Sequence, residues 1–244
     1  MAKKTIAVIP ARYESVRLPG KPLIELAGKT IIQRVYEQVS KAELVDEVII
    51  ATDDERILDH AKSFGARAEM TSADHQSGTD RIAELAKKNN DWDVIVNVQG
   101  DEPFIEPANI DKAIEPFKHD PTIKMTSLYH ELSDEAEINN PNNVKVVTDM
   151  NDDALYFSRS PIPFPRDEKS SEPYKKHIGL YAYKRETLLS LSELSPSELE
   201  KVEKLEQLRA LENKISIKML KVESAPIGID TQEDLEKAQT MLSA

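Results

Sequence analysis

The sequence predicts an α/β protein with a mainly parallel central sheet, helices on both faces of the sheet, and a smaller inserted region. Two observations lead to this fold class. Short β-branched runs alternate with longer segments of helical periodicity through the first half of the chain. The length of 244 residues, with 39% hydrophobic and 31% charged side chains, suits one large domain. We therefore expect a single domain over residues 1–244, in which about 125–190 form the inserted region.

The first half of the chain contains four predicted strands. They cover 5–9, 45–52, 66–71 and 93–98. The last is the most completely apolar, as expected at the centre of a parallel sheet. Apolar spacings of three and four, or capping residues, predict a helix after each of the first three strands. These are a helix with the stripe Ile31, Ile32, Val35 and Val39, a helix capped by Asp53 or Asp54 that reaches Gly65, and a helix over 78–88.

The second half is less regular. Strand-like stretches cover 125–132, 144–148, 154–158, 178–183 and 215–222. Residues 160–173 are rich in proline and predict a long ordered loop or lid. Ser195-Pro196-Ser197-Glu198 matches a capping box with proline at the first helical position, and predicts a helix to about Asn213. Leucines recur every three residues in this segment, which indicates either that the helix is buried on several sides or that it contains a break. Thr231 is predicted to cap the last helix.

The composition excludes several classes of protein. The chain has no cysteine, so disulfides, thiolate metal sites and a cysteine nucleophile are excluded. A net charge of −12 argues against a nucleic-acid partner and against an anionic membrane surface. No apolar run reaches the length of a membrane span or of a signal-peptide core, so we expect a cytoplasmic protein.

Basic residues gather locally at the start of the chain, between the first strand and the first helix. Arg12, Arg17 and Lys21 lie five and four residues apart in a loop stiffened by prolines. Ligands bind at the carboxyl ends of parallel strands, and three cations there suit a polyphosphate. The alternative is a solvated basic loop. Gly20-Lys21 and Gly28-Lys29-Thr30 each resemble the end of a P-loop. The glycine that a P-loop requires five residues earlier is Ser15 in the first and Leu23 in the second, and no Gly-x-Gly-x-x-Gly occurs.

Two aspartates follow glycines at the ends of apolar segments. Asp101 comes after the fourth strand and Gly100, and Asp230 stands just before the last helix. Taken alone, each is more typical of a cap or a turn. Opposite a polyphosphate loop, the pair becomes a candidate Mg²⁺ site, because Mg²⁺ takes one or two carboxylates together with phosphate oxygens and water.

Nine short blocks, spread over both halves of the chain, carry a resemblance to a known family. They are 9–12, 17–23, 51–54, 77–81, 97–103, 156–163, 177–181, 205–209 and 230–231. In these blocks and their order, the chain from about Ile6 to Leu242 resembles the 3-deoxy-manno-octulosonate cytidylyltransferase (CMP-KDO synthetase) family. The resemblance implies a Rossmann-like nucleotidyltransferase fold of the nucleotide-diphospho-sugar transferase type.

The resemblance also implies an activity and partners. The reaction would convert CTP and the sugar acid KDO to CMP-KDO and diphosphate, with Mg²⁺ as cofactor, for lipopolysaccharide synthesis. The protein would be a cytoplasmic homodimer, with the inserted region serving dimerisation and sugar binding. Two alternatives stay open. The same chemistry could act on a related sugar acid, either 8-amino-KDO or a sialic-type acid, or the chain could be a non-catalytic nucleotide-binding module.

The family's site residues carry over onto matching positions of this sequence. Catalytic roles fall to Arg12, Arg17, Lys21, Asp101 and Asp230, of which Asp101 and Asp230 would ligate Mg²⁺. The nucleotide would contact Pro10, Ala11, Arg12, Ser15, Arg17, Lys21, Ser77, Gly78, Thr79, Arg81, Gln99 and Asp101. The sugar acid would contact Arg159, His177, Tyr181, Glu206 and Gln207. Without the resemblance, Tyr181 and His177 are more typical of packing residues and Glu206 of a solvated helix charge.

Overall fold

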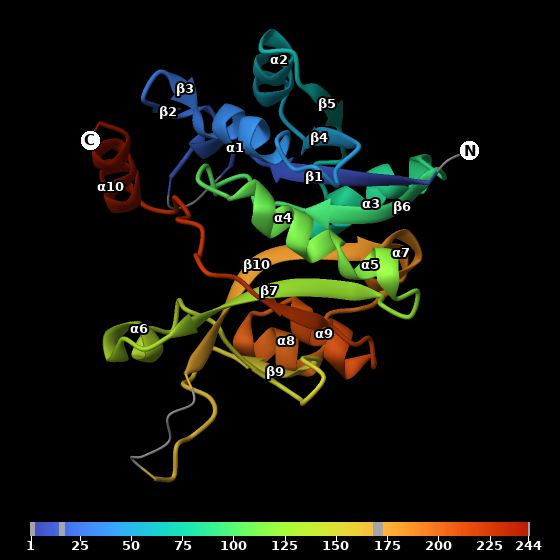
Figure 1. The fold of residues 1–244 in the computed structure, drawn as a ribbon. Helices are drawn as coiled ribbons and strands as arrows, with labels where there is room; N and C mark the ends of the chain where they lie inside the picture. Colours follow the sequence, from blue (N-terminus) through green and yellow to red (C-terminus); the bar gives the residue numbers. More distant parts are fainter. Residues whose placement is uncertain (1–2, 15–17, 168–172, 244) are drawn as a thin grey trace.

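A computed structural model describes residues 3–14, 18–167 and 173–243. Its main sheet follows the strand path β11-β7-β10-β6-β1-β4-β5 (Figure 1). The strands of this path are β1 (Lys4–Ala11), β4 (Glu47–Thr52), β5 (Arg67–Met70), β6 (Trp92–Asn97), β7 (Met125–Leu132), β10 (Tyr174–Lys184) and β11 (Lys218–Lys221). Among these seven, only β10 runs against the others. The prediction of a mainly parallel sheet with 93–98 at its centre is therefore confirmed, because β6 is the middle strand of the path.

The inserted region is less separate than its sequence indicates. Its β7 and β10 belong to the main sheet, whereas β8 (Lys145–Thr148) and β9 (Ala154–Ser158) extend the sheet beyond β10. The stretch 159–167, in the predicted proline-rich loop, contains no regular element and leads away from the body of the molecule (Figure 1). A small hairpin, β2 (Glu25–Leu26) and β3 (Lys29–Thr30), follows the basic loop and was not predicted.

Helices cover both faces of the sheet, because alternate strand residues point to opposite faces. The helices are α1 (Ile31–Val39), α2 (Glu55–Ser63), α3 (Gly78–Lys88), α4 (Pro107–Ile114), α5 (Pro116–His119), α6 (Glu135–Asn139), α7 (Arg185–Glu193), α8 (Glu198–Glu203), α9 (Gln207–Glu212), α10 (Gln232–Ser243) and the 3₁₀ turn η1 (Lys21–Leu23). Ile9 packs in the core under α1, α2, α4 and α10, whereas the next residue back, Val8, packs in the core under α3, α7 and α9.

One predicted cap is confirmed and another is corrected by the structure. Asp54 caps α2, since its Oδ1 accepts the Arg56 backbone N–H at 2.9 Å, while Asp53 turns to another partner described below. The capping box at the third-last helix begins at Ser197 and not at Ser195, because the Glu200 side chain accepts the Ser197 backbone N–H at 3.0 Å. Proline at position 196 therefore precedes the helix.

The leucine-rich segment breaks into two helices. Lys204 takes a left-handed conformation, with φ 55° and ψ 47°, which ends α8 and lets α9 start in a new direction. Of the two expectations for this segment, the break is confirmed. Thr231 caps α10 as predicted, because its Oγ1 accepts the Asp234 backbone N–H at 3.2 Å.

The carboxyl ends of β1 and β6 meet where the strand order reverses. From β1 the chain moves to β4 on one side, and from β6 it moves to β7 on the other side, with β10 lying between β6 and β7. A crevice is expected at this point of an open α/β sheet. Gly100 allows the two ends to approach closely, since a Cβ atom there would lie 2.8 Å from the carbonyl oxygen of Pro10.

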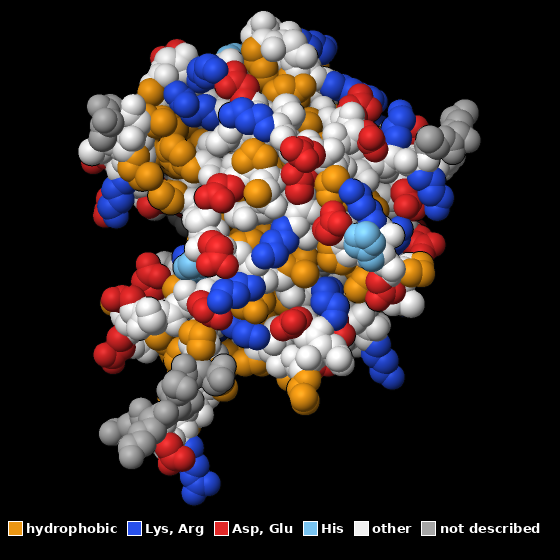
Figure 2. Space-filling model, viewed as in Figure 1, with side chains coloured by type: hydrophobic (Ala, Val, Ile, Leu, Met, Phe, Trp, Pro, Cys, Tyr) orange, Lys and Arg blue, Asp and Glu red, His pale blue; other side chains and the backbone are white. Residues whose placement is uncertain are grey.

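Charges of both signs are mixed over the surface. Figure 2 shows Lys and Arg side chains interspersed with Asp and Glu side chains across the visible face, and no large area of one sign gathers there. In the described ranges, no helix is both long and apolar enough to span a membrane.

Candidate active site

The loops after β1 and β6 enclose a cavity of about 280 Å³, which we call the phosphate cavity. It occupies the crevice expected from the strand order. Its lining residues are Pro10, Ala11, Arg12, Glu14, Lys21, Pro22, Gly78, Gln99, Gly100 and Asp101. Most of the residues predicted to bind the nucleotide are thus brought together, although they come from three separate stretches of chain. Ser15 and Arg17, also predicted, lie outside the described residues.

One ammonium group joins the two predicted metal ligands at the edge of this cavity. Lys21 Nζ lies 2.6 Å from Asp101 Oδ2 and 3.0 Å from Asp230 Oδ1. Burial would lower the pKa of Lys21, but the charges and hydrogen bonds of the two carboxylates outweigh it, so its pKa is raised. Next to them, burial together with the charges of Asp101 and Asp230 raises the pKa of Glu102 to about 8.

The two aspartates fit the coordination that a magnesium ion requires. The two carboxylates come from distant parts of the chain and both contact Lys21 Nζ. Two carboxylates, completed by phosphate oxygens and water, form an ordinary Mg²⁺ site. No group of three or more acidic or histidine side chains converges as a metal site anywhere in the described ranges, so most ligands would have to come from substrate and solvent.

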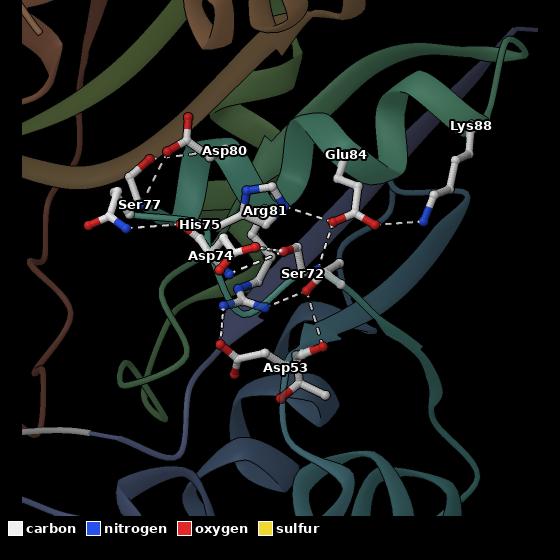
Figure 3. A network of polar contacts seen from close by, with 12 residues as sticks. Asp53, Ser72, Asp74, His75, Ser77, Asp80, Arg81, Glu84 and Lys88 are labelled. Carbon is white, nitrogen blue, oxygen red and sulfur yellow. Dashed lines mark hydrogen bonds and ion pairs between the residues drawn. The ribbon is translucent and has the colours of Figure 1, made fainter.

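Arg12 is held by the loop before α3. Its guanidinium donates to the carbonyl oxygen of His75, and the His75 ring lies 2.7 Å from Glu84 Oε2 (Figure 3). Burial opposes ionisation of Glu84, but hydrogen bonds from Lys88, from the Ser72 backbone and from His75 lower its pKa to about 2. This polar network orients Arg12 through a backbone carbonyl.

Arg81 lies inside the protein and not in the cavity. It is fully buried, and its guanidinium donates to Asp53 Oδ2 at 2.6 Å and to Thr71 Oγ1 (Figure 3). The pair explains why Asp53 does not cap α2. As placed here, Arg81 has no exposed surface for a nucleotide, and it fastens α3 to the ends of β4 and β5.

A second cavity, of about 250 Å³, lies between β6, β10, α3 and α9, and we call it the tyrosine cavity. Its lining residues are Gly78, Thr79, Asn97, Gln99, Met125, Gly179, Tyr181, Tyr183, Leu191, Glu206, Gln207, Arg209 and Ala210. Gly78 and Gln99 line both cavities. The phosphate cavity and the tyrosine cavity therefore share a wall.

Burial dominates the electrostatics of the tyrosine cavity. It raises the pKa of Tyr181 and Tyr183 well above the usual range for a phenol, and it also raises the pKa of Glu206. The Glu206 carboxylate accepts from Ser77 Oγ at 3.3 Å. Ser77, predicted to bind the nucleotide, thus links the start of α3 to the tyrosine cavity.

The predicted sugar residues do not all reach this cavity. Tyr181, Glu206 and Gln207 line it. His177 lies behind Tyr181, buried, with Nε2 2.9 Å from Ser127 Oγ, and burial lowers its pKa to about 3. Arg159 lies elsewhere, because its guanidinium donates to the carbonyl oxygens of Pro141, Glu203 and Lys204. As placed here, Arg159 fixes the turn between α8 and α9 and is not in the cavity wall.

Three polar residues of the tyrosine cavity were missed by the sequence analysis, namely Asn97, Tyr183 and Arg209. A signal for the first two exists. Tyr181 pairs with Asn97 across the β10–β6 ladder, and Tyr183 stands two residues further on the same face. Arg209 carried no such signal, since it reaches the cavity from α9 while paired with Glu200 at 2.6 Å.

Comparison with known proteins agrees with this geometry. A family model described as cytidylyltransferase matches residues 6–218. A 3-deoxy-manno-octulosonate cytidylyltransferase from Solibacter usitatus is 52% identical over 100% of this chain and 96% of its own length. The chain belongs to this family. The corresponding protein of Geobacter metallireducens is 50% identical over 98% of both chains.

Solved structures place the fold in the same family. A CMP:2-keto-3-deoxy-manno-octonic acid synthetase complexed with CTP superposes with a TM-score of 0.94, at 44% identity over 99% of both chains. The cytidylyltransferase family member described here also shares its fold with a 4-diphosphocytidyl-2C-methyl-D-erythritol synthase from Anaerococcus prevotii. That match has a TM-score of 0.67 at 17% identity, over 99% of both chains. The nucleotidyltransferase fold that the resemblance implied is confirmed.

Proposed function

We propose that this protein transfers the cytidylyl group of CTP to 3-deoxy-manno-octulosonate, releasing diphosphate and CMP-KDO. The observation that carries the proposal is the shared wall of the two cavities. A charged cavity suited to a triphosphate meets a hydroxyl-binding cavity at Gly78 and Gln99. The α-phosphorus of a nucleotide in the first cavity would then lie next to a sugar hydroxyl in the second.

The chemistry is an in-line displacement at phosphorus. The sugar hydroxyl oxygen forms a bond to the α-phosphorus, the bond from that phosphorus to the diphosphate oxygen breaks, and the hydroxyl proton is released. Arg12 and Lys21, with Arg17, would neutralise the charge of the departing diphosphate. Asp101 and Asp230 would hold Mg²⁺, which when bound supplies further neutralisation of phosphate charge.

The tyrosine cavity suits a polyhydroxylated acid. Tyr181, Asn97 and Gln207 offer hydrogen-bond donors and acceptors, and the Glu206 carboxylate accepts from sugar hydroxyls. Arg209 is the one cationic residue among the described lining residues, and its guanidinium is already paired with Glu200 at 2.6 and 2.8 Å. It would therefore place a partly compensated positive charge beside the acceptor's carboxylate. Gln99 donates to the Gly179 carbonyl at 3.1 Å, which fixes the wall between donor and acceptor.

The remaining proposals rest on the family resemblance. They are a homodimer, a cytoplasmic location and a role in lipopolysaccharide synthesis. The mixed charge over the face seen in Figure 2 is consistent with small-molecule substrates.

Diphosphate release tests the proposed function. The protein is incubated with CTP or UTP, with and without Mg²⁺, across KDO, its 8-amino analogue and neuraminic acid. We expect release with CTP, Mg²⁺ and KDO, at a rate well above that with the other two acids. Faster release with the 8-amino or nine-carbon acid would move the proposal to that acceptor. No release with any acceptor, from protein that still binds CTP, would favour a non-catalytic nucleotide-binding module.

A further inference from the structure

Lys21 occupies a central position among the acidic groups of the phosphate cavity. Its Nζ contacts Asp101 at 2.6 Å and Asp230 at 3.0 Å, and its side chain is only 15% exposed. The three residues come from η1, from the loop after β6 and from the loop before α10. One ammonium group therefore closes the gap between two carboxylates that are far apart in the sequence.

The ammonium group lies between the two carboxylates that a divalent cation would have to bind. If the proposed function is right, Asp101 and Asp230 hold Mg²⁺ during turnover, and this inference rests on that assignment. Lysine is a compact point charge that hydrogen-bonds to carboxylate oxygens, and its flexible stem lets it change partners. An ammonium group and a metal ion cannot both lie between the same two oxygens.

The phosphate cavity offers Lys21 another partner once a nucleotide is present. Lys21 lines the same wall as Arg12 and Gln99, so phosphate oxygens bound there fall within reach of its Nζ. The backbone around Lys21 is held in place, since Lys21 starts η1 after Gly20 at φ 67° and the following Pro22 is buried. Any exchange of partners would therefore come from rotation of the flexible four-carbon stem of the lysine. The backbone is thus fixed while the ammonium group can exchange carboxylates for phosphates.

We propose that Lys21 serves as a resident counter-ion between Asp101 and Asp230, so that a divalent cation binds there only after a nucleoside triphosphate draws the ammonium group away. The free protein then binds divalent metal weakly. Metal and nucleotide enter together, and the charge of the two aspartates stays partly compensated when the cavity is empty.

Manganese binding to the nucleotide-free protein tests this proposal without any turnover. Free Mn²⁺ is titrated by electron paramagnetic resonance against the unaltered protein, Lys21→Met, Lys21→Arg and Lys29→Met. We expect Lys21→Met to bind Mn²⁺ at least tenfold more tightly than the unaltered protein. Lys21→Arg keeps a cation between the two carboxylates, so this variant should bind Mn²⁺ as weakly as the unaltered protein does. Lys29→Met is the matched control. Lys29 lies on β3, away from the phosphate cavity, and among the described contacts its side chain pairs only with Glu37 of α1 at the surface.

A second set of variants separates this inference from the proposed function. Adding Asp101→Asn to Lys21→Met should abolish the gain in Mn²⁺ affinity. Equal affinities of Lys21→Met and the unaltered protein would overturn the counter-ion role, even if Asp101→Asn still weakened Mn²⁺ binding in the presence of CTP. If Asp101→Asn and Asp230→Asn left Mn²⁺ binding with CTP unchanged, the metal assignment of the proposed function would fail as well.

Discussion

In the phosphate cavity, an ammonium group lies between two partly exposed carboxylates, and each of these charges can exchange its partner for a ligand. In the tyrosine cavity, the polar groups are buried. Burial raises the pKa of Tyr181 and of Glu206, because it disfavours the charged form of each side chain. The two cavities share Gly78 and Gln99. The donor side of this site therefore depends on mobile charge, and the acceptor side on fixed hydrogen-bonding groups in a drier environment.

The largest effect is expected in the phosphate cavity, from Asp101→Asn. Loss of this charge removes one of the two carboxylates proposed to hold Mg²⁺, and with it the cation that would neutralise the reacting phosphate, so kcat should fall about 10²–10³-fold. Diphosphate release at saturating CTP, KDO and Mg²⁺ measures the effect. Asp91→Asn, which removes a surface ion pair with Lys4, should change kcat less than twofold. A near-normal kcat for Asp101→Asn would show that the phosphate cavity does not depend on this charge.

The next effect concerns α3, the helix whose first residue, Gly78, lies in the wall shared by the two cavities. Arg81→Met leaves Asp53 without its buried partner and loosens α3, so the free energy of unfolding should fall by about 3 kcal/mol. Urea unfolding measures it. Arg67→Met is the matched control, because Arg67 makes two exposed ion pairs and its loss should cost less than about 1 kcal/mol. Equal losses for both variants would mean that Arg81 contributes no more than a surface arginine.

A third effect is a pH dependence that originates behind the tyrosine cavity. His177 has a pKa of about 3 in the folded protein against 6.5 as its ordinary value, because it is buried. The unfolded chain takes up a proton below pH 6.5 and the folded chain does not, so stability from this group is complete above that pH and falls toward pH 3. Between pH 7 and pH 5 the contribution of His177 alone falls by about 2 kcal/mol, while Glu102, with its pKa of about 8, contributes in the opposite direction. Urea unfolding at both pH values checks it.

The control for this pH dependence is a variant without the buried imidazole. The difference in unfolding free energy between the unaltered protein and His177→Gln should change by about 2 kcal/mol between pH 7 and pH 5. The difference between the unaltered protein and His119→Gln, at an exposed helix end, should stay constant. If His177→Gln kept the full pH dependence, the histidine behind Tyr181 would not be held neutral by burial.

The smallest effect separates the two substrates. Glu206→Gln keeps the size of the side chain but removes a charged acceptor in the tyrosine cavity, so KM for the sugar acid should rise about tenfold. KM for CTP should stay within twofold. Glu212→Gln, at the exposed end of α9, is the matched control and should alter neither constant. A rise in the KM for CTP alone would assign Glu206 to the donor side.

The parallel half of the molecule could be predicted closely from sequence, and the other half less so. The runs that became β1, β4 and β6 are buried on both faces, so their apolar character alone marks them. The helices α4 and α7 were not predicted, and the cap of α8 lies two residues later than expected. There, the chain's path depends on contacts with distant segments, such as the hydrogen bonds that Arg185 of α7 donates to the carbonyl oxygens of Ala86 and Asn89.

The same limit applies to the site. Motifs identified Lys21, Asp101 and Asp230 as neighbours, but they could not show that the lysine lies between the two carboxylates. Motifs also grouped Arg81 and Arg159 with ligand-binding residues, whereas the structure directs both guanidinium groups to protein partners. A cation in a motif can serve either purpose, and only the positions of the surrounding oxygens distinguish them.

One measurement tests the division of labour between the two cavities directly. A crystal structure of the protein with CMP-KDO bound should place the phosphate of the product in the phosphate cavity beside Gly78 and Gln99. The sugar acid should lie against Tyr181, Glu206 and Gln207, with its carboxylate toward Arg209. A sugar acid bound outside the tyrosine cavity, or a phosphate remote from the shared wall, would contradict the account.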